Sequence, residues 1–482
     1  MRNRTTFSSL LLLILLSYIA VDGQTVQRNP IIIIPGFSGT EIVDAEGRTV
    51  WFSVKRGKTD DLRLPIQSPV ISHNRDSLQP KDLIRSVDIK LFPDIEVYQS
   101  LIDSLKAKGY TEAQWNDPKA ANVFYVFPYD WRRDNVESAQ LLMRRMAAVR
   151  KAVRDPKLKF DILAHSMGGL IARYAAMYGT ADLPAEGVQP KPNGSGAAFM
   201  NKIMMFGTPN EGSFNAFEAL LRGSPIIADR KLPFVDDLRP EDVFATPSMF
   251  QLLPHPSAAR FYDENLKPIA LDLYDADTWL KYGWGALADP KFLGKLKDAP
   301  RLALTNKDIK PKALDKKANI DDRLTGRTTY AQARSYFVSV LSRAKRFHSA
   351  LDVVEKNVPL DLYAFGGNCS QTLDGAVLIH DEKDNKWTTL LEAKDIKAND
   401  GTEYKKDQVK ELIYSLGDGR VTQRSLLAAT QKMTNGKPEF DDGIYPIKTS
   451  VFACGVHIRL FLEKEIQDSF LSALLVEKES TP

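Results

Sequence analysis

The chain has 482 residues, of which 43% are hydrophobic and 26% are charged. This composition is typical of folded globular proteins and excludes wholesale disorder, collagen and an extended coiled coil. The 65 basic and 61 acidic side chains leave a net charge of +4, which argues against a protein built to bind nucleic acid. The two cysteines are too few for a disulfide scaffold or for a zinc site of four thiolates.

The first 23 residues have the pattern of a secretory signal. Arg2 and Arg4 precede an apolar run that continues to Val21, where a cleavage site with small residues follows. The run is shorter than the roughly 20 apolar residues that a bilayer-spanning helix needs. We therefore expect export to a periplasm, a lumen or the medium, with a mature chain that begins near Gln24. An uncleaved N-terminal membrane anchor is the alternative.

Strand and helix patterns alternate from residue 29 to about residue 215. The first expected strand, Ile31–Ile34, is apolar on both faces, as strands inside parallel sheets are. The elements expected after it are helix 97–106, strand 123–127, helix 138–153, strand 160–163, helix 167–177 and strand 202–206. This alternation predicts an α/β fold with a mostly parallel central sheet.

The pattern changes after residue 224. Residues 225–355 are rich in Lys, Asp, Leu and Ala at helical spacing, for example at 330–347, and predict an inserted, mostly helical cap. The elements expected after the cap are strand 359–365, a hairpin of 375–380 with 387–391, strand 445–452 and helix 460–475. The expected divisions are a signal at 1–23, a first core part at 24–224, the cap at 225–355 and a second core part at 356–482.

Residues 164–168 read Ala-His-Ser-Met-Gly between an expected strand and an expected helix. This is the pattern of a nucleophile elbow with Ala164 in place of the first glycine, and it makes Ser166 the candidate nucleophile. The tight turn requires small residues two positions before and after the serine. It holds the hydroxyl at a helix N-terminus, where developing negative charge is favoured.

A nucleophilic serine needs a base, and the base needs an acid to orient it. His457 follows the last expected core strand, where the chain order Ser, Asp, His puts the base. Asp418 stands between two glycines that allow a sharp turn, and we expect it to be the acid. The alternatives are His380 for the base and Asp374 for the acid. The histidines expected at the surface are His73, His255 and His348.

An oxyanion hole needs two backbone N–H groups. One is expected from Met167, which follows the nucleophile, and the other from Phe37 in the loop after the first strand, with Ser38 as the second choice. His, Cys and carboxylate residues do not cluster at metal-ligand spacing in the sequence, so neither a metal nor another cofactor is expected.

Together these motifs resemble the lecithin:cholesterol acyltransferase family, which includes phospholipid:diacylglycerol acyltransferases and bacterial relatives. The matching segments are 34–42, 129–132, 164–169, 206–212, 247–254, 417–419 and His457, which span nearly the whole mature chain. The Tyr-Asp-Trp-Arg and Pro-Ser-x-x-Gln-Leu-Leu-Pro segments are the most specific. The serine elbow and Gly-Thr-Pro are shared by many lipases.

The resemblance implies an α/β-hydrolase fold with an inserted cap and lid, and fatty acyl transfer from a lipid ester through an acyl-serine. It implies that Ser166, Asp418 and His457 form a triad and that Phe37 and Met167 supply the oxyanion N–H groups. The sequence departs from the family at Arg420, where Gly-Asp-Gly-Thr-Val has threonine. Arg420 either meets an acidic head group or faces water.

Two aromatic or charged features have alternative interpretations. Asp130 and Arg132 are expected to pair in a buried corner beside the oxyanion loop, and a direct role in substrate binding is the alternative. Trp51 is either a membrane-facing residue, suited to peripheral contact with a lipid surface, or a contact within a small hairpin.

Cys369 and Cys454 each follow an expected core strand in a chain that we expect to be exported, and both lie at one edge of the sheet if those two strands are neighbours. We therefore expect a disulfide between them that pins the loop with His457.

The expected function is that of a lipid O-acyltransferase or phospholipase-type serine enzyme. It would cleave a lipid ester and pass the acyl group to an alcohol or to water. The alternative enzyme is a plain secreted lipase, esterase or polyester depolymerase. The alternative that is not an enzyme is an inactive lipid-binding protein with the same fold.

Overall fold

The computed structural model describes residues 27–52, 62–87, 95–224, 237–298, 328–353, 360–429, 431–434, 437–440 and 446–475, so the expected signal lies outside it. Its centre is a seven-stranded sheet in which every neighbouring pair is parallel. The strand order is β21 (Ile447–Ala453), β12 (Asp361–Gly367), β10 (Met200–Phe206), β9 (Phe160–His165), β1 (Ile31–Ile34), β8 (Val123–Val126) and β7 (Thr111–Glu112).

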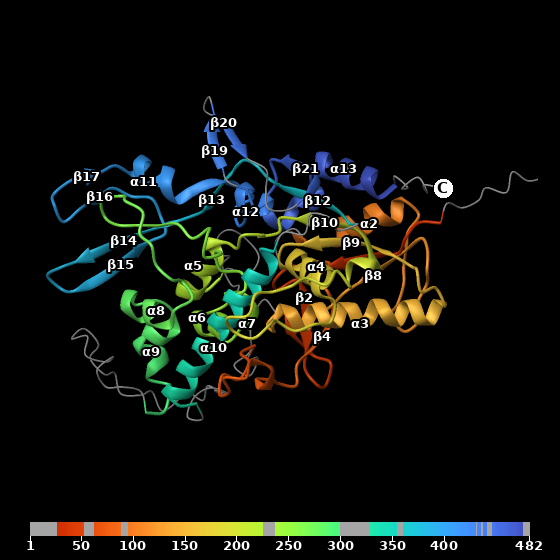
Figure 1. The fold of residues 1–482 in the computed structure, drawn as a ribbon, viewed down its shortest axis with the longest axis horizontal. Helices are drawn as coiled ribbons and strands as arrows, with labels where there is room; N and C mark the ends of the chain where they lie inside the picture. The colour runs from red at the N-terminus through yellow and green to blue at the C-terminus, as the bar shows by residue number, and fades with distance from the viewer. Residues whose placement is uncertain are drawn as a thin grey trace, which may run out of the picture.

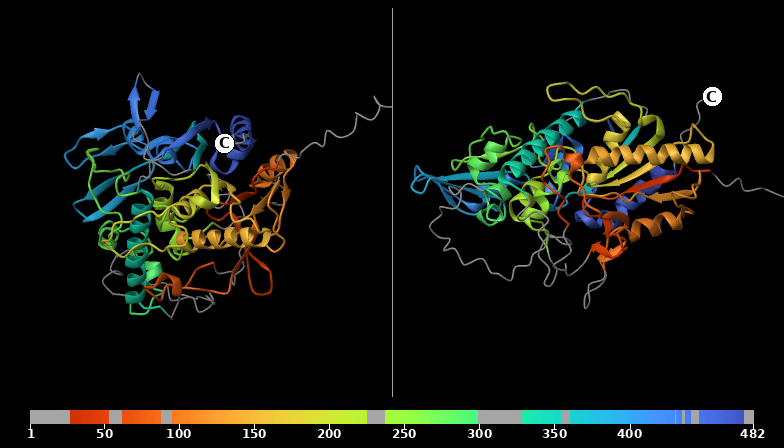
Figure 2. Two further views of the ribbon diagram at one scale, coloured as in Figure 1. Left: turned by 45° about the vertical axis from the view of Figure 1, so that its right-hand side comes forward. Right: turned by 90° about the horizontal axis from the view of Figure 1, so that it is seen from below.

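Helices cover both faces of this sheet (Figures 1 and 2). In β1, Ile32 and Ile34 join the core under α3 (Asn135–Val153) and α4 (Met167–Tyr178). Ile31 and Ile33 join a second core under α2 (Gln99–Ala107) and α13 (Lys464–Leu475). Alternate side chains of a strand point to opposite faces, which is why a fully apolar strand occurs here. The predicted parallel α/β sheet is confirmed.

α3 and α13 begin several residues away from their predicted starts. α3 begins before residue 138 because the Asp134 side chain caps it and accepts a hydrogen bond from the Val136 N–H at 2.9 Å. The expected last helix is divided into the 3₁₀ turn η5 (His457–Leu462) and α13, since Glu463 between them has an extended backbone. After β21 the chain therefore makes a tight turn that begins at His457, and α13 starts only after this turn.

The described part of the cap is mostly helical. Its elements are α6 (Pro240–Phe244), α7 (Pro247–Phe250), β11 (Phe261–Tyr262), α8 (Ala276–Tyr282), η3 (Ala286–Ala288), α9 (Pro290–Leu293) and α10 (Tyr330–Leu351). Thr329 and Gln332 form a capping box at the start of α10. Because α10 packs against α4 and α7, the cap continues the helical layer of the core.

Between β12 and β21 the chain leaves the central sheet. The predicted hairpin is present as β14 (Ala376–Asp381) and β15 (Lys386–Leu390), but it pairs with β11 of the cap (Figure 1). The same excursion contains β13 (Ser370–Leu373) and β18 (Tyr414–Gly417), which pair antiparallel and return the chain to the end of β12. Its other elements are β16 (Ile396–Lys397), β17 (Glu403–Tyr404), α11 (Lys406–Ile413), α12 (Gln423–Leu427), β19 (Gln431–Thr434) and β20 (Lys437–Phe440).

Several short elements complete the described chain. β2 (Thr40–Val43), β3 (Thr49–Trp51) and β4 (Gln79–Leu83) form a small antiparallel sheet after β1. The others are η1 (Ile71–His73), β5 (Ser86–Val87), β6 (Ile95–Glu96), η2 (Ala197–Phe199) and α5 (Phe214–Arg222). Among the helices that the structure describes, none is both long enough and apolar enough to cross a bilayer.

Candidate active site

Ser166 stands in a sharp turn between β9 and α4. Its backbone has φ 53° and ψ −124°, a conformation that non-glycine residues seldom adopt. Its N–H donates to the Phe206 carbonyl at 2.7 Å, which ties the turn to the end of β10. Gly36 makes room for the serine, since a Cβ on Gly36 would lie 2.8 Å from the Ser166 Cβ. This is the backbone geometry that a nucleophile elbow requires.

The structure brings Ser166, His457 and Asp418 together. His457 Nε2 lies 2.9 Å from Ser166 Oγ, and His457 Nδ1 lies 2.8 Å from Asp418 Oδ2. His457 follows β21 and Asp418 follows β18, so two separate segments supply the partners of the serine. All three side chains are buried.

The two alternative residues lie elsewhere. His380 stacks on Trp387 within the β14–β15 hairpin. Asp374 is engaged in a buried ion-pair network, 2.7 Å from Arg424 and 2.9 Å from Arg260. Neither is a hydrogen-bond partner of Ser166 or His457.

Asp418 is held as a carboxylate. Burial alone would raise its pKa, but the attraction to His457, the hydrogen bond to that ring and two backbone N–H groups together lower the pKa below its ordinary value. The N–H groups of Arg420 and Val421 donate to Asp418 Oδ1 at 2.9 and 2.8 Å. Asp418 Oδ2 is therefore an acceptor for Nδ1–H, which leaves His457 Nε2 to accept the serine proton.

The loop after β1 faces the serine. Phe37 lines the same cavity as Ser166, and Met167 is the first residue of α4. Two hydrogen bonds from buried aromatic side chains hold the backbone of this loop. The Trp51 indole N–H donates to the Ser38 carbonyl at 2.8 Å, and the Tyr129 hydroxyl donates to the Pro35 carbonyl at 2.9 Å.

Trp51 corrects one prediction. Its side chain is 1% exposed, and its ring centroid lies 5.3 Å from that of Trp131. The β2–β3 pairing folds this ring under the loop with Phe37, so the membrane-facing interpretation is wrong and the hairpin contact is the one present. The reason is that Trp51 belongs to β3, and its side chain packs into the hydrophobic core.

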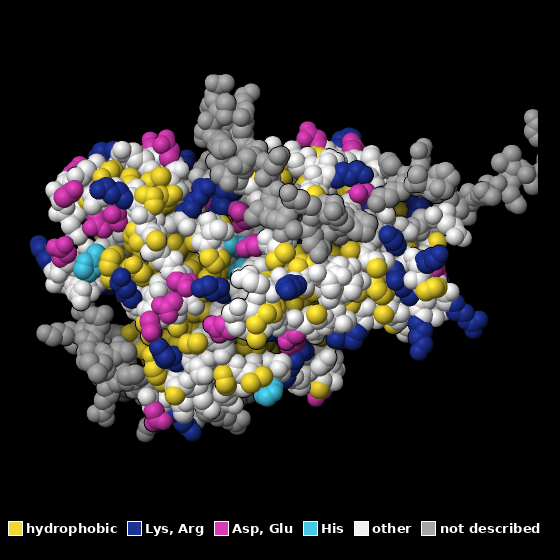
Figure 3. Space-filling model, in the orientation of Figure 1, with side chains coloured by type: hydrophobic (Ala, Val, Ile, Leu, Met, Phe, Trp, Pro, Cys, Tyr) yellow, Lys and Arg dark blue, Asp and Glu magenta, His cyan; other side chains and the backbone are white. Residues whose placement is uncertain are grey.

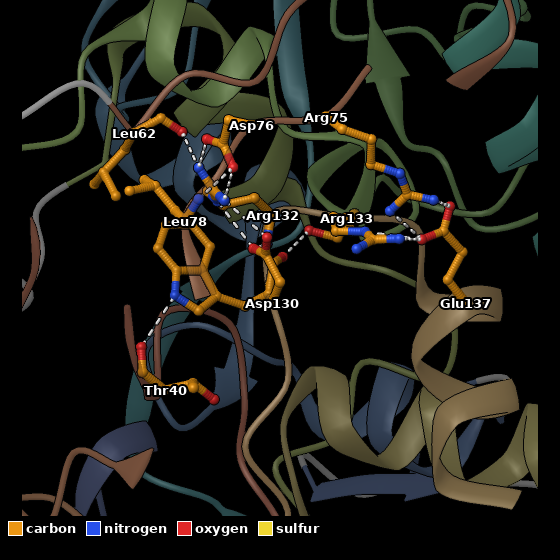
Figure 4. Close-up of polar contacts among 11 residues, drawn as sticks. Thr40, Leu62, Arg75, Asp76, Leu78, Asp130, Arg132, Arg133 and Glu137 are labelled. Carbon is orange, nitrogen blue, oxygen red and sulfur yellow. Dashed lines mark hydrogen bonds and ion pairs between the residues drawn. The ribbon is translucent and has the colours of Figure 1, made fainter. Parts of the chain in front are cut away.

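Asp130 and Arg132 lie in a buried corner below the loop (Figure 4). Arg132 is fully buried and bonds to Asp130 at 2.8 and 2.9 Å and to Asp76 at 2.7 and 3.0 Å. Arg132 also donates to the Leu62 carbonyl at 3.1 Å. Two carboxylates offset the cost of burying one guanidinium, and none of these groups lines the cavity at Ser166. The corner therefore supports the backbone.

A cavity of about 110 Å³ opens above Ser166. Most of its wall is apolar and comes from Phe37, Pro209, Ala216, Ala219, Leu238, Met249, Leu252, Val421 and Ile458. Among the described residues that line the cavity, Arg420 is the only one of the types Lys, Arg, Asp and Glu. Hydrophobic side chains also gather across the middle of the face shown in Figure 3. The arrangement suits an ester with an apolar chain.

Two histidines expected at the surface are buried. His255 and His348 are 1% and 0% exposed, and their ring centroids lie 4.0 Å apart. His255 Nδ1 bonds to Asp352 Oδ1 at 2.8 Å. The helical spacing in the sequence could have predicted the burial of His348, because this residue continues the buried stripe of Leu341 and Ala344 on α10.

Cys369 and Cys454 are joined by a disulfide with a Cα–Cα distance of 5.2 Å. They lie just beyond the ends of β12 and β21, which are paired in the sheet. Because Cys454 precedes His457 by three residues, the bond ties the histidine loop to the neighbouring strand.

The geometry can be compared with known proteins. The parallel sheet, its two helical layers and the serine turn after β9 form the predicted α/β-hydrolase fold. One similar solved structure is the Tle4-Tli4 complex, with 13% identity over 92% of this chain and 97% of that chain and a TM-score of 0.43. Another is the Bacillus licheniformis lipase BlEst2 in mature form, with 10% identity over 95% and 96% and a TM-score of 0.33.

At the level of sequence, no curated protein matches the chain. Residues 86–260 match the model of the family described as lecithin:cholesterol acyltransferase. This match supports the view that the chain is an enzyme that hydrolyses lipid esters or transfers their acyl groups. The matched segment contains the Tyr-Asp-Trp-Arg corner, the serine elbow and the Gly-Thr-Pro turn. The match over residues 86–260 confirms the resemblance to the lecithin:cholesterol acyltransferase family that the motifs predict.

Proposed function

We propose that this protein is a serine enzyme that cleaves a lipid ester through an acyl-serine at Ser166 and passes the acyl group to an alcohol or to water. The observation that carries the proposal is the buried chain of hydrogen bonds from Ser166 through His457 to Asp418. A serine and histidine at 2.9 Å, with a carboxylate on the second ring nitrogen, is the arrangement that activates a hydroxyl for attack.

Each residue has a role in this proposal. Ser166 Oγ attacks the ester carbonyl carbon while His457 Nε2 takes its proton, and Asp418 stabilises the imidazolium that forms. The N–H groups of Phe37 and Met167 hold the oxyanion of the tetrahedral intermediate. The intermediate collapses to acyl-Ser166, and the leaving alcohol takes the proton from His457. An acceptor hydroxyl then loses its proton to His457 and attacks the acyl carbon, and Ser166 Oγ leaves as it takes that proton back from His457.

Arg420 is proposed to contact an anionic group of the substrate. Its backbone is fixed, because its carbonyl accepts from the Ser213 hydroxyl at 2.5 Å and its N–H donates to Asp418 at 2.9 Å. Its side chain borders the cavity beside the serine. A guanidinium in that position favours the phosphate of a phospholipid over an uncharged ester.

Export is part of the proposal. The disulfide between Cys369 and Cys454 supports it, since such bonds persist in oxidising compartments and are rare in the cytosol. A lipid ester substrate would then reach the cavity from a membrane or another lipid surface.

The test compares the wild type with Ser166→Ala on phosphatidylcholine vesicles that carry a labelled acyl chain, with a sterol or a long-chain alcohol added. Label in a new ester, absent with the variant, supports acyl transfer. Label only in free fatty acid indicates a phospholipase or lipase. If neither product forms from phospholipids, triglycerides or polyesters, and a fluorophosphonate does not label Ser166, the proposed activity is wrong and a lipid-binding protein is favoured.

A further inference from the structure

We propose that Tyr98 and His165 are positioning residues that couple the loop carrying Phe37 to the loop carrying His457. Neither side chain has a role in the chemistry described above. This inference rests on the proposed function, because it assigns the two residues to the alignment of the base and the oxyanion loop.

Three hydrogen bonds make the connection. The Gly36 N–H donates to the Tyr98 hydroxyl oxygen at 2.9 Å. The Tyr98 oxygen lies 2.8 Å from His165 Nδ1, and His165 Nε2 lies 3.0 Å from the carbonyl oxygen of His457. The path begins one residue before Phe37 and ends on the backbone of the base.

The partners determine where each proton lies. The carbonyl of His457 can only accept, so His165 Nε2 must carry the hydrogen. The Tyr98 oxygen already accepts from Gly36, so its own hydrogen is directed to His165 Nδ1, which accepts. Every donor in the path then meets one acceptor, and His165 is the neutral Nε2–H tautomer.

The surroundings keep His165 in this form. Burial, followed by repulsion from His457, lowers the pKa of His165 to about 3. Burial also raises the pKa of Tyr98, so its hydroxyl keeps its hydrogen. With both ring nitrogens engaged, His165 is not available as a second base for the neighbouring Ser166.

The packing leaves little freedom for the path to move. The Phe461 ring lies 5.3 Å from His165 and 5.8 Å from Tyr98, centroid to centroid. A Cβ on Gly36 would lie 3.2 Å from His165 Nδ1. On the other side, the His457 N–H donates to the Asp418 carbonyl at 2.9 Å. Both polar backbone groups of His457 are therefore held, which fixes its ring for the bond to Ser166.

The experiment measures p-nitrophenyl butyrate turnover and the rate of fluorophosphonate labelling at Ser166. In Tyr98→Phe and His165→Leu we expect kcat and the labelling rate to fall roughly 10- to 100-fold, with KM nearly unchanged, because the loss is one of alignment. His165→Gln retains an N–H that can reach the His457 carbonyl, so it should recover part of the loss. Tyr110→Phe is the matched control, since it removes a hydroxyl from the same buried cluster.

A second measurement on the wild type does not depend on a variant that folds. Nitrogen NMR of labelled histidines should show His165 as the Nε2–H tautomer, without titration between about pH 5 and about pH 8. Wild-type kcat in folded Tyr98→Phe and His165→Leu, or a His165 that titrates in this range, overturns the inference. If the wild type neither turns over the ester nor reacts with the fluorophosphonate, the proposed function fails first and the inference fails with it.

Discussion

Gly207 occupies a position where any side chain would collide with Asp418. A Cβ on Gly207 would lie 2.8 Å from Asp418 Oδ2 and 2.9 Å from His457 Nδ1, the two atoms that form the acid–base hydrogen bond. Gly207 also has φ 58°, a backbone conformation that favours glycine. The Gly-Thr-Pro turn after β10 thus makes space for contact between two segments that come from elsewhere in the chain.

The first prediction concerns this space. Gly207→Ala should lower kcat by roughly 100-fold, because the methyl group pushes Asp418 away from His457. Gly47→Ala is the control, since Gly47 has φ 79° and open space around it. Both variants should lose about 1–2 kcal/mol in the free energy of unfolding from the positive φ alone. Equal activity in the two variants would show that the close approach at Gly207 has no effect on the site.

The second prediction separates the two candidate acids. Asp418→Asn should reduce kcat by about 10³- to 10⁴-fold, because a neutral amide neither holds the Nδ1–H tautomer nor stabilises the imidazolium. Asp374→Asn should reduce the free energy of unfolding through its ion pairs with Arg424 and Arg260 and leave kcat nearly unchanged. Ester turnover and urea unfolding of both variants check this. The reverse pattern would make Asp374 the acid.

The third prediction is a pH dependence of stability from His165. Its pKa is lowered from the ordinary 6.5 to about 3 by burial and by His457. Between these two values the unfolded chain binds a proton that the folded protein does not, so the free energy of unfolding falls as the pH falls. From pH 6.5 to about pH 5 this group should account for ~2 kcal/mol.

His165→Gln carries no such group and should lose less stability over the same range. Urea unfolding of both proteins at several pH values measures the difference. Parallel curves would mean that His165 binds its proton equally in the folded and the unfolded protein.

The fourth prediction concerns the disulfide. Its partners are 85 residues apart, and replacing both Cys369 and Cys454 with serine should cost about 4 kcal/mol in the free energy of unfolding. Because the bond ties the loop with His457 to β12, kcat should also fall. Thermal unfolding of the wild type with and without a reductant gives the same comparison in the native chain. Free thiols in the wild type, found by mapping without reduction, would contradict the pairing.

The fifth prediction tests Arg420. Arg420→Thr places the residue common in the family at this position and removes the cation from the wall of the cavity. We expect kcat/KM to fall roughly tenfold on a phospholipid and to change little on an uncharged ester of the same chain length, since one charge-assisted contact is lost. Equal losses on both substrates would indicate a structural role for Arg420.

The local pattern of residues in the sequence was enough to predict the central strands and the turn that carries Ser166. Ile31–Ile34 is apolar throughout because both faces of β1 are buried, and the small residues around Ser166 are required by the elbow itself. Chain order pointed to Asp418 and His457, and in the structure His457 lies against Ser166 while Asp418 lies against the other side of the His457 ring. The strand and elbow signals are local, since each depends on residues within one strand or one turn, whereas the partners of the serine were predicted from their order along the chain.

The tertiary structure decided what depends on residues distant in sequence. It buried Trp51 beneath the Phe37 loop and paired the β14–β15 hairpin with the cap, although a strand pattern does not specify its partner. It also placed His165 between Tyr98 and His457, which are 67 and 292 residues away along the chain. The elbow fixes where the residue before the nucleophile lies, but the hydrogen bonds of its side chain are set by which distant groups the fold packs against it.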